Sequence, residues 1–224
     1  MSLTTDLPCD ALLFDLDGVL IDSTAAILRI WQEWADSHGV DMQEIERVAH
    51  GLRSEETIRL VAPHLDAKVE AELFMQRELL DSVGVVAFEG ALPLVSTLPE
   101  GAWAVVTSAR EELVKIRMPI AGLPVPRMLV TADDVKEGKP SPEPYLAGAK
   151  KVGVAPERCL VVEDAPAGIQ AAKAAGMRVV AVASTHSHDV LEMNGADMVL
   201  DKISDLRVQP GTGNWRLTAS RGMD

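Results

Sequence analysis

Two aspartates follow a short apolar run near the start of the chain, a placement suited to phosphate chemistry. Asp15 and Asp17 come after the apolar residues 11–14, and Gly18 then lets the backbone turn sharply. Such a run is typical of a buried parallel strand, and open α/β sheets bind ligands at the carboxyl ends of these strands. Two carboxylates this close repel each other when ionised, so a divalent cation must neutralise them or one must hold a proton and can act as a general acid. The alternative is an acidic turn after a strand.

Hydroxyl groups and a lysine stand in comparable places further along the chain. Thr107 and Ser108 follow the apolar residues 102–106, and their hydroxyl and backbone N–H groups suit phosphate oxygens at a helix entrance. Lys139 comes just before a capped helix start, where its positive charge can hold a phosphoryl group against neighbouring carboxylates. Taken singly, the hydroxyl pair also fits a helix cap and the lysine a solvated loop.

A second pair of carboxylates, Glu163 and Asp164, follows the apolar residues 160–162. Its oxygens supply further ligands of the kind that octahedral magnesium requires, although an acidic turn would look the same. The order of the four groups decides between these interpretations. Chance would rarely place two aspartates, a hydroxyl pair, a lysine and a carboxylate pair in this order, mostly at the strand ends of one sheet. We therefore predict a single site for phosphate chemistry.

Helices and strands alternate from about residue 90 onward, which implies parallel pairing with right-handed crossovers. The sequence predicts strands over residues 11–14, 102–106, 128–130, 160–162, 179–182 and 198–200. It predicts helices over residues 24–37, 42–49, 55–61, 67–82, 91–98, 111–117, 141–151 and 167–175. The fold class is therefore α/β, a doubly wound parallel sheet with a helical insertion after the first strand. Such an insertion lies above the strand ends and can act as a lid.

Two polar segments near the C-terminus are predicted to lack regular structure. His186 and His188 resemble a metal-binding pair, but they have no third ligand nearby in the sequence, so we predict a loop there. Residues 207–224 are rich in Pro, Gly, Ser and Thr and show little periodicity, which predicts a loosely held tail.

Composition argues against several classes of protein. The 224 residues can bury a substantial core, as one large domain or as a domain with an insertion. The net charge of −13 disfavours binding to nucleic acid or to an anionic membrane, and no apolar run approaches the ~18 residues of a membrane span. The two cysteines, Cys9 and Cys159, are far apart and indicate no disulfide framework, which favours a reducing, cytoplasmic setting.

Four motifs together resemble those of the haloacid dehalogenase-like hydrolase superfamily. They occupy residues 14–23 (Phe-Asp-Leu-Asp-Gly-Val-Leu-Ile-Asp-Ser), 105–108 (Val-Val-Thr-Ser), 138–140 (Gly-Lys-Pro) and 161–164 (Val-Val-Glu-Asp). The resemblance spans residues 11 to about 206 and includes the position of the insertion. It implies a Rossmann-like core formed by residues 1–22 and 88–206, an all-helical cap of the C1 type formed by residues 23–87, and a C-terminal tail formed by residues 207–224.

The resemblance also implies a role for each motif residue. Asp15 would be the nucleophile, and Asp17 the general acid and base. Lys139 would orient the nucleophile and bind the phosphate. The other groups on the phosphate would be Gly18, Thr107 and Ser108. Mg²⁺ would be held by Asp15, the backbone carbonyl of Asp17, Asp164 and, directly or through water, Glu163.

The residues of the first motif and the first cap helix narrow the reaction. True dehalogenases of this superfamily lack the second aspartate of the first motif, whereas Asp17 is present here. β-Phosphoglucomutase-like members carry a histidine on the first cap helix, where this chain has Ile27. The absence of that histidine favours hydrolysis over retention of the intermediate for mutase turnover.

The cap carries a stretch that bears on the substrate. His50-Gly-Leu-Arg53 looks like the His-Gly-x-Arg stretch of sugar and polyol phosphatases in this family. A guanidinium such as that of Arg53 can clamp hydroxyl, carboxylate or phosphate oxygens from above. A surface arginine that pairs with Glu55 or Glu56 is an equally open interpretation.

We therefore expect a magnesium-dependent phosphatase that hydrolyses small phosphorylated sugars or polyols through an aspartyl-phosphate intermediate. A phosphoglycolate phosphatase and a β-phosphoglucomutase-like mutase are the alternative enzymes. A module that binds a phosphometabolite to regulate a partner is the alternative that is not an enzyme. Whichever of these is right, the expected partner of the protein is a small phosphorylated metabolite, not nucleic acid or a membrane. The oligomeric state stays open, with a monomer favoured.

Overall fold

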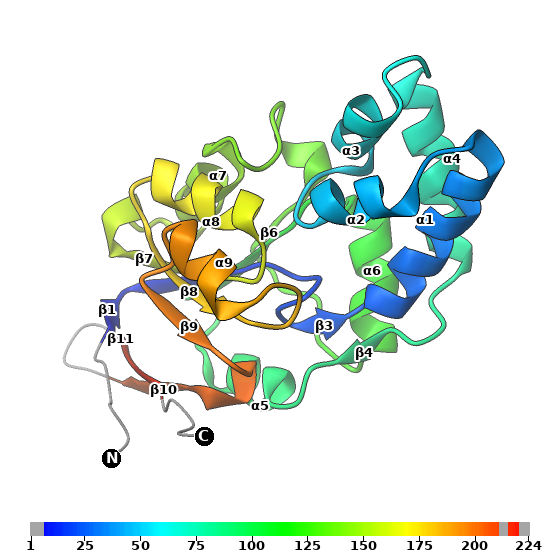
Figure 1. Cartoon of the computed structure of the whole chain (residues 1–224). Coiled ribbons are helices and arrows are strands. Elements are labelled where there is room, and N and C mark those ends of the chain that lie inside the picture. Colours follow the sequence, from blue (N-terminus) through cyan, green and yellow to red (C-terminus); the bar gives the residue numbers. More distant parts are fainter. Residues whose placement is uncertain (1–6, 211–214, 220–224) are drawn as a thin grey trace.

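A six-stranded parallel sheet forms the centre of the computed structural model, which describes residues 7–210 and 215–219 (Figure 1). The strand order is β6-β5-β2-β7-β8-β9, so the first strand of this sheet lies between the two halves of the chain that follow it. This order is that of a doubly wound α/β fold, which places a binding site at the carboxyl end of β2. The strands are β2 Ala11–Phe14, β5 Trp103–Val106, β6 Leu129–Val130, β7 Cys159–Glu163, β8 Arg178–Val182 and β9 Met198–Leu200.

Alternate side chains of the buried strands build a core on each face of the sheet. Leu12 and Phe14 of β2 pack in one apolar cluster, and Leu13 packs in the other, as the period of two in a strand requires. Helices α5 Ala91–Thr97 and α6 Glu111–Ile120 cover the first face. Helices α7 Glu143–Val152, α8 Pro166–Ala174 and α9 His188–Met193 cover the second. The predicted α/β fold is confirmed.

Four helices inserted after β2 form a separate layer, the cap, which Figure 1 shows grouped to one side of the sheet. They are α1 Thr24–His38, α2 Met42–Ala49, α3 Ser54–Val61 and α4 Ala67–Leu80. Trp31, Trp34 and Phe74 are buried in their own apolar cluster, so the cap has a core of its own. A two-stranded antiparallel pair, β3 Ile21–Asp22 with β4 Val86–Ala87, joins the cap to the sheet domain.

The C-terminal region differs from the sequence-based prediction. In place of a loosely held tail, β10 Leu206–Pro210 and β11 Trp215–Ala219 form an antiparallel sheet with β1 Leu7–Cys9. Residues 211–214 and 220–224 lie outside the described residues. Strand β11 pairs with β10, its neighbour in sequence, and also with β1 from the other end of the chain, a pairing that local periodicity does not encode.

The loop predicted at residues 186–188 is confirmed for His186 but is wrong for His188, which begins a helix. Helix α9 begins at His188, with Ser187 as its N-cap residue. The described residues also form three short 3₁₀ helices: η1 Ala132–Asp134, η2 Pro156–Arg158 and η3 Ile203–Asp205. Within the described part of the chain, no helix combines the length and the apolar character needed to cross a bilayer.

Candidate active site

The charged centre of the site lies at the carboxyl ends of β2 and β7. Asp15 follows β2, and Glu163 is the last residue of β7, which pairs in parallel with β2. Lys139 reaches both from the loop before α7, where its Nζ donates to Oδ1 of Asp15 at 2.7 Å and to Oε1 of Glu163 at 2.6 Å. All three side chains are buried. Burial works to lower the pKa of Lys139, but the two carboxylates outweigh it and raise that pKa above its usual value, so the lysine stays charged.

Glu163 is held on every side, which fixes the position of Lys139. Its Oε1 also accepts a hydrogen bond from the Tyr145 hydroxyl at 2.7 Å. Its Oε2 accepts from the backbone N–H groups of Asp164 and Ala165, at 2.9 and 3.1 Å. Burial works against its charged form, but Lys139 and these donors lower the pKa of Glu163 below its usual value. Glu163 is therefore an anion that anchors the lysine.

Asp164 carries an oxygen without a partner. Its Oδ2 accepts from the Thr185 hydroxyl at 2.5 Å, whereas its buried Oδ1 has no hydrogen-bond partner among the described residues. Buried carboxylate oxygens are rarely left unpaired, because desolvation then goes uncompensated. The orphaned oxygen is the kind of group that a bound cation satisfies.

Three carboxylates of this cluster form a candidate metal centre. One oxygen each from Asp15, Glu163 and Asp164 lies within 4.8 Å of the others. Three carboxylates against the single ammonium group of Lys139 leave an excess of two negative charges when all are ionised. Burial, against the pull of Lys139, raises the pKa of Asp15 to about 7, and burial with the neighbouring carboxylates raises the pKa of Asp164 well above its usual value. A divalent cation would balance the two excess negative charges and favour the ionised carboxylates.

Asp17, the predicted acid and base, lies at the edge of this cluster with its carboxylate tied through one oxygen. Its Oδ1 accepts hydrogen bonds from the Ser23 hydroxyl at 2.5 Å and from Nη1 of Arg117 at 3.0 Å. Nη2 of the same arginine donates to Oε1 of Glu78, on cap helix α4, at 3.0 Å. The prediction from the sequence therefore did not include Arg117 and Glu78 among the site residues. The signal was present in α6, where Arg117 occupies the buried helix face beside Val114.

The predicted phosphate-binding hydroxyls follow β5, as expected, but they have protein partners. Thr107 is buried, and its Oγ1 accepts from the backbone N–H of Ala109 at 3.0 Å. Ser108 Oγ donates to the backbone carbonyl of Gly51, in the cap, at 2.7 Å. Both residues line the cavity above Asp15, so their roles on phosphate stay predictions.

A cavity of about 150 Å³ separates the charged centre from the cap. Its core wall includes Asp15, Asp17, Gly18, Thr107 and Asp164. Its cap wall combines apolar side chains, among them Ile27, Trp31, Ile45, Phe74 and Met75, with polar ones, among them Glu46, Thr57 and Glu78. The volume suits a small molecule whose reacting group meets the carboxylates while its other end faces the cap.

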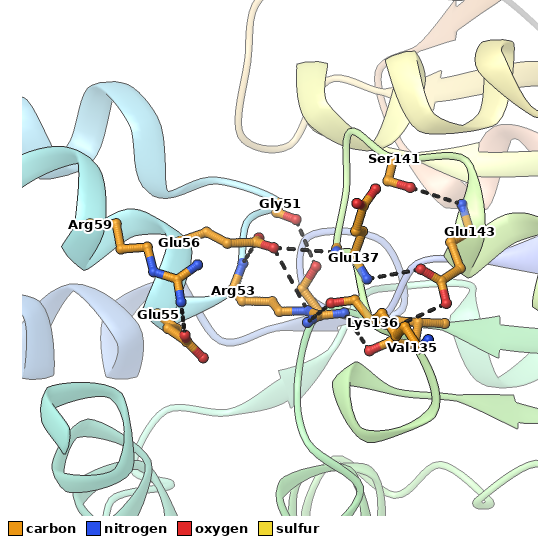
Figure 2. A network of polar contacts seen from close by, with 12 residues as sticks. Gly51, Arg53, Glu55, Glu56, Arg59, Val135, Lys136, Glu137, Ser141 and Glu143 are labelled. Carbon is orange, nitrogen blue, oxygen red and sulfur yellow. Dashed lines mark hydrogen bonds and ion pairs between the residues drawn. The ribbon is translucent and has the colours of Figure 1, made fainter. Parts of the chain in front are cut away.

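Arg53 lies outside the residues that line this cavity. Its guanidinium donates to the backbone carbonyls of Val135 and Lys136, each at 3.1 Å, as Figure 2 shows. Glu56 completes the contact, because its Oε1 accepts from the N–H of Gly138 at 3.2 Å and also lies 4.0 Å from Nε of Arg53. The network joins the start of α3 to the loop that carries Lys139. A substrate contact by Arg53 stays a prediction, and it would require the guanidinium to leave these carbonyls.

Two histidine rings, one from the cap and one from the core, lie against each other. The rings of His50, at the end of α2, and His186, after β8, lie 5.1 Å apart with an edge-to-face orientation. Burial lowers the pKa of both histidines below the usual value, so both rings are uncharged near neutral pH. His188 instead pairs with Asp201 at 2.8 Å, so the two histidines of this segment have different partners.

Known proteins resemble this chain over most of its length. Residues 12–182 match the family model described as haloacid dehalogenase-like hydrolase. Hexitol phosphatase A of Escherichia coli (strain K12) is 40% identical over 205 residues, covering 89% of this chain and 94% of that protein. Glycerol-1-phosphate phosphohydrolase 1 of Saccharomyces cerevisiae is 35% identical over 224 residues, covering 93% and 89%. The crystal structure of a hydrolase from Pseudomonas syringae superposes with a TM-score of 0.76 at 27% identity, covering 88% and 95%.

Proposed function

The chain belongs to the haloacid dehalogenase-like hydrolase family, and we propose that within it the protein is a magnesium-dependent phosphatase of small sugar or polyol phosphates. One observation carries the proposal: Lys139 bonds both Asp15 and Glu163, whose carboxylates cluster with that of Asp164, and Oδ1 of Asp164 has no partner among the described residues. Asp15, the carboxylate proposed as the nucleophile, and Asp164, the carboxylate with an unpartnered oxygen, therefore line one cavity, and the buried Lys139 is bonded to Asp15 from outside that lining. A module that only bound a phosphometabolite would not need this arrangement together with a second aspartate.

The residues act in two steps. The Asp15 carboxylate attacks phosphorus and forms an aspartyl phosphate, while the bond from phosphorus to the alcohol oxygen breaks and Asp17 gives that oxygen a proton. Water then attacks the phosphorus of the aspartyl phosphate and gives its proton to Asp17, which releases inorganic phosphate and restores Asp15. Lys139 offsets the negative charge of the phosphoryl group, and Gly18 lies in the loop around it. The Thr107 hydroxyl is a further donor, and the Ser108 hydroxyl becomes one when it leaves the Gly51 carbonyl.

Magnesium would be held by Asp15, the backbone carbonyl of Asp17 and Asp164, with Glu163 nearby or bridged by water, and it would supply positive charge against the phosphate. The position of Gly18 supports this assignment. Its φ is +87°, and a Cβ there would lie 2.1 Å from Oδ2 of Asp164. Only glycine lets the loop after β2 come this close to the carboxylate.

The charge of the cavity supports a substrate with one phosphate group and neutral hydroxyl groups. Both arginines that line it are already paired with carboxylates: Arg110 with Glu72 and Asp133, and Arg117 with Asp17 and Glu78. A second anionic group, such as the carboxylate of phosphoglycolate, would find no unpaired arginine among the described lining residues. Two relatives named as phosphatases of hexitol phosphate and glycerol 1-phosphate point the same way.

The mutase alternative depends on the position of Ile27. This residue lines the cavity from α1, so an apolar side chain stands where the mutase-like members carry their histidine. That substitution favours loss of the phosphoryl group to water. We also propose a cytoplasmic monomer; the free, buried thiols of Cys9 and Cys159 are compatible with a reducing setting.

Phosphate release tests the proposal against its alternatives. Wild type and Asp15→Asn are compared on glycerol 1-phosphate, a hexitol 6-phosphate, phosphoglycolate and β-glucose 1-phosphate, each with magnesium or EDTA. We expect magnesium-dependent release from the polyol phosphates, less from phosphoglycolate, and none in the variant. Isomerisation of β-glucose 1-phosphate without release would indicate a mutase, and binding without any turnover would indicate the regulatory module.

A further inference from the structure

Arg117 is a buried charge placed between the core and the cap. It lies on core helix α6 with 1% of its surface exposed. Removing a guanidinium from water is costly unless strong hydrogen bonds replace the lost hydration. Two form here, from Nη1 to Asp17 and from Nη2 to Glu78, both 3.0 Å long, whereas the buried Nε has no hydrogen-bond partner among the described residues. The planar fork of the guanidinium fixes the direction of both bonds.

Glu78 fixes Arg117 from the other side. The glutamate belongs to α4 of the cap, and its side chain keeps only 13% of its surface exposed. Helices α4 and α6 pack against each other, so the pair is enclosed where cap and core meet. Arg117 therefore has its orientation set by a carboxylate that belongs to a different part of the molecule from Asp17.

The contact engages one oxygen of Asp17 and leaves the other available. Both described hydrogen bonds to this side chain, from Ser23 and Arg117, end on Oδ1. Among the described residues, Oδ2 has no hydrogen-bond partner, and Asp17 lines the cavity. Two donors on Oδ1 leave Oδ2 as the oxygen that can exchange a proton with a leaving group or with water.

We propose that Arg117 is a positioning residue that orients Asp17 for proton transfer, and that Glu78 holds Arg117 in place from the cap. The inference rests on the proposed function, in which Asp17 is the acid and base. The described hydrogen bonds of Arg117 go to Asp17 and Glu78, and none goes to Asp15, Glu163 or Asp164. Its effect is confined to the step that needs a correctly aimed proton.

That confinement separates the proposal from a purely structural role. An alcohol oxygen must receive a proton as its bond to phosphorus breaks, whereas acetate leaves acetyl phosphate without one. The experiment therefore measures single-turnover phosphoryl transfer by rapid quench, with magnesium present and enzyme in excess. The two probes are glycerol 1-phosphate and acetyl phosphate.

Arg117→Gln is expected to slow transfer from glycerol 1-phosphate by about 30-fold, and transfer from acetyl phosphate by less than about 5-fold. Arg117→Lys keeps the charge but loses the fork, so it should recover part of the rate with glycerol 1-phosphate. Arg110→Gln is the matched control, because Arg110 also joins the core to α4, through Glu72 at 2.7 Å, without touching Asp17. It should change both rates by the same factor.

Equal slowing of both substrates by Arg117→Gln would overturn the proposal, and so would an unchanged rate with glycerol 1-phosphate. Arg117→Lys carries the same comparison if the glutamine variant does not fold. Asp17→Asn separates failure of the proposed role of Asp17 from failure of the proposed role of Arg117. If it shows no selective loss with glycerol 1-phosphate, the proposed role of Asp17 fails and this inference with it. If Asp17→Asn is selective and the Arg117 variants are not, only the inference about Arg117 fails.

Discussion

Gly18 and Asp164 lie so close that a single added carbon would collide with the carboxylate. A Cβ on residue 18 would stand 2.1 Å from Oδ2 of Asp164, and the backbone at Gly18 has a φ of +87°. The loop after β2 and the end of β7 can therefore meet only through a glycine. This contact places the loop of the first motif directly on a carboxylate of the candidate metal centre.

Gly18→Ala is expected to weaken magnesium binding by about 10-fold or more, because Asp164 must move away from the added methyl group. Gly176→Ala is the matched control, since φ there is +77° but nothing lies within 4 Å of the new Cβ. Both variants should lose about 1 kcal/mol of stability from the strained backbone, and Gly18→Ala should lose more because its methyl group also collides with Asp164. Calorimetric titration with magnesium checks the difference. Wild-type affinity in Gly18→Ala would contradict the close approach.

Tyr145→Phe is expected to reduce the free energy of unfolding by about 1 kcal/mol, because the buried hydroxyl donates to Oε1 of Glu163. The same change should lower kcat, since Glu163 then holds Lys139 with one fewer constraint. Urea denaturation and steady-state rates check both effects. If neither stability nor kcat changes, the hydroxyl has no part in anchoring Glu163.

Arg53→Gln distinguishes a contact between cap and core from a contact with substrate. Loss of the bonds to Val135 and Lys136 should raise KM by about 5-fold for glycerol 1-phosphate and a hexitol 6-phosphate alike. Arg59→Gln is the control, because Arg59 lies on the same helix, is exposed and pairs with Glu55. A KM that rises only for the longer substrate would instead support the sequence-based expectation that Arg53 contacts substrate.

His50 makes the protein less stable in acid. Burial, with His186 as the second cause, lowers the pKa of His50 below its usual value. As the pH falls, the unfolded chain therefore takes up this proton before the folded chain does. The contribution of His50 to stability is fully present above the pKa of the unfolded state, and it is lost as the pH falls towards the lower pKa of the folded state. Relative to His50→Gln, wild type should lose stability as the pH falls through and below about 6.5, the usual pKa of histidine. A stability difference that stays constant over this range would contradict the shift.

Residues at strand ends could be predicted from the sequence because strands and their polar endings are local patterns. Asp15, Thr107 and Asp164 each follow a buried apolar run, and parallel pairing brings such ends to one edge of a sheet. Lys139 was placed with them only through its position in the series of motifs. The structure shows its contacts with Asp15 and Glu163.

Contacts between distant segments were missed, because no local pattern encodes them. Arg117 and Glu78 are separated by 39 positions, and each alone resembles an ordinary charged helix residue. The link from Ser108 to Gly51 joins the sheet to the cap across 57 positions. The strand that precedes Asp10 pairs with the far end of the chain for the same reason. A charged residue on the apolar face of α6 was the one available clue.

The central claim is that Asp15 becomes phosphorylated during turnover. An acid quench during the reaction with glycerol 1-phosphate and magnesium, followed by borohydride, would reduce an aspartyl phosphate to homoserine, which peptide mass spectrometry locates. The account predicts homoserine at position 15 and nowhere else, with none formed in EDTA or in the Asp15→Asn variant. Homoserine at another aspartate, or undiminished phosphate release by Asp15→Asn, would contradict it.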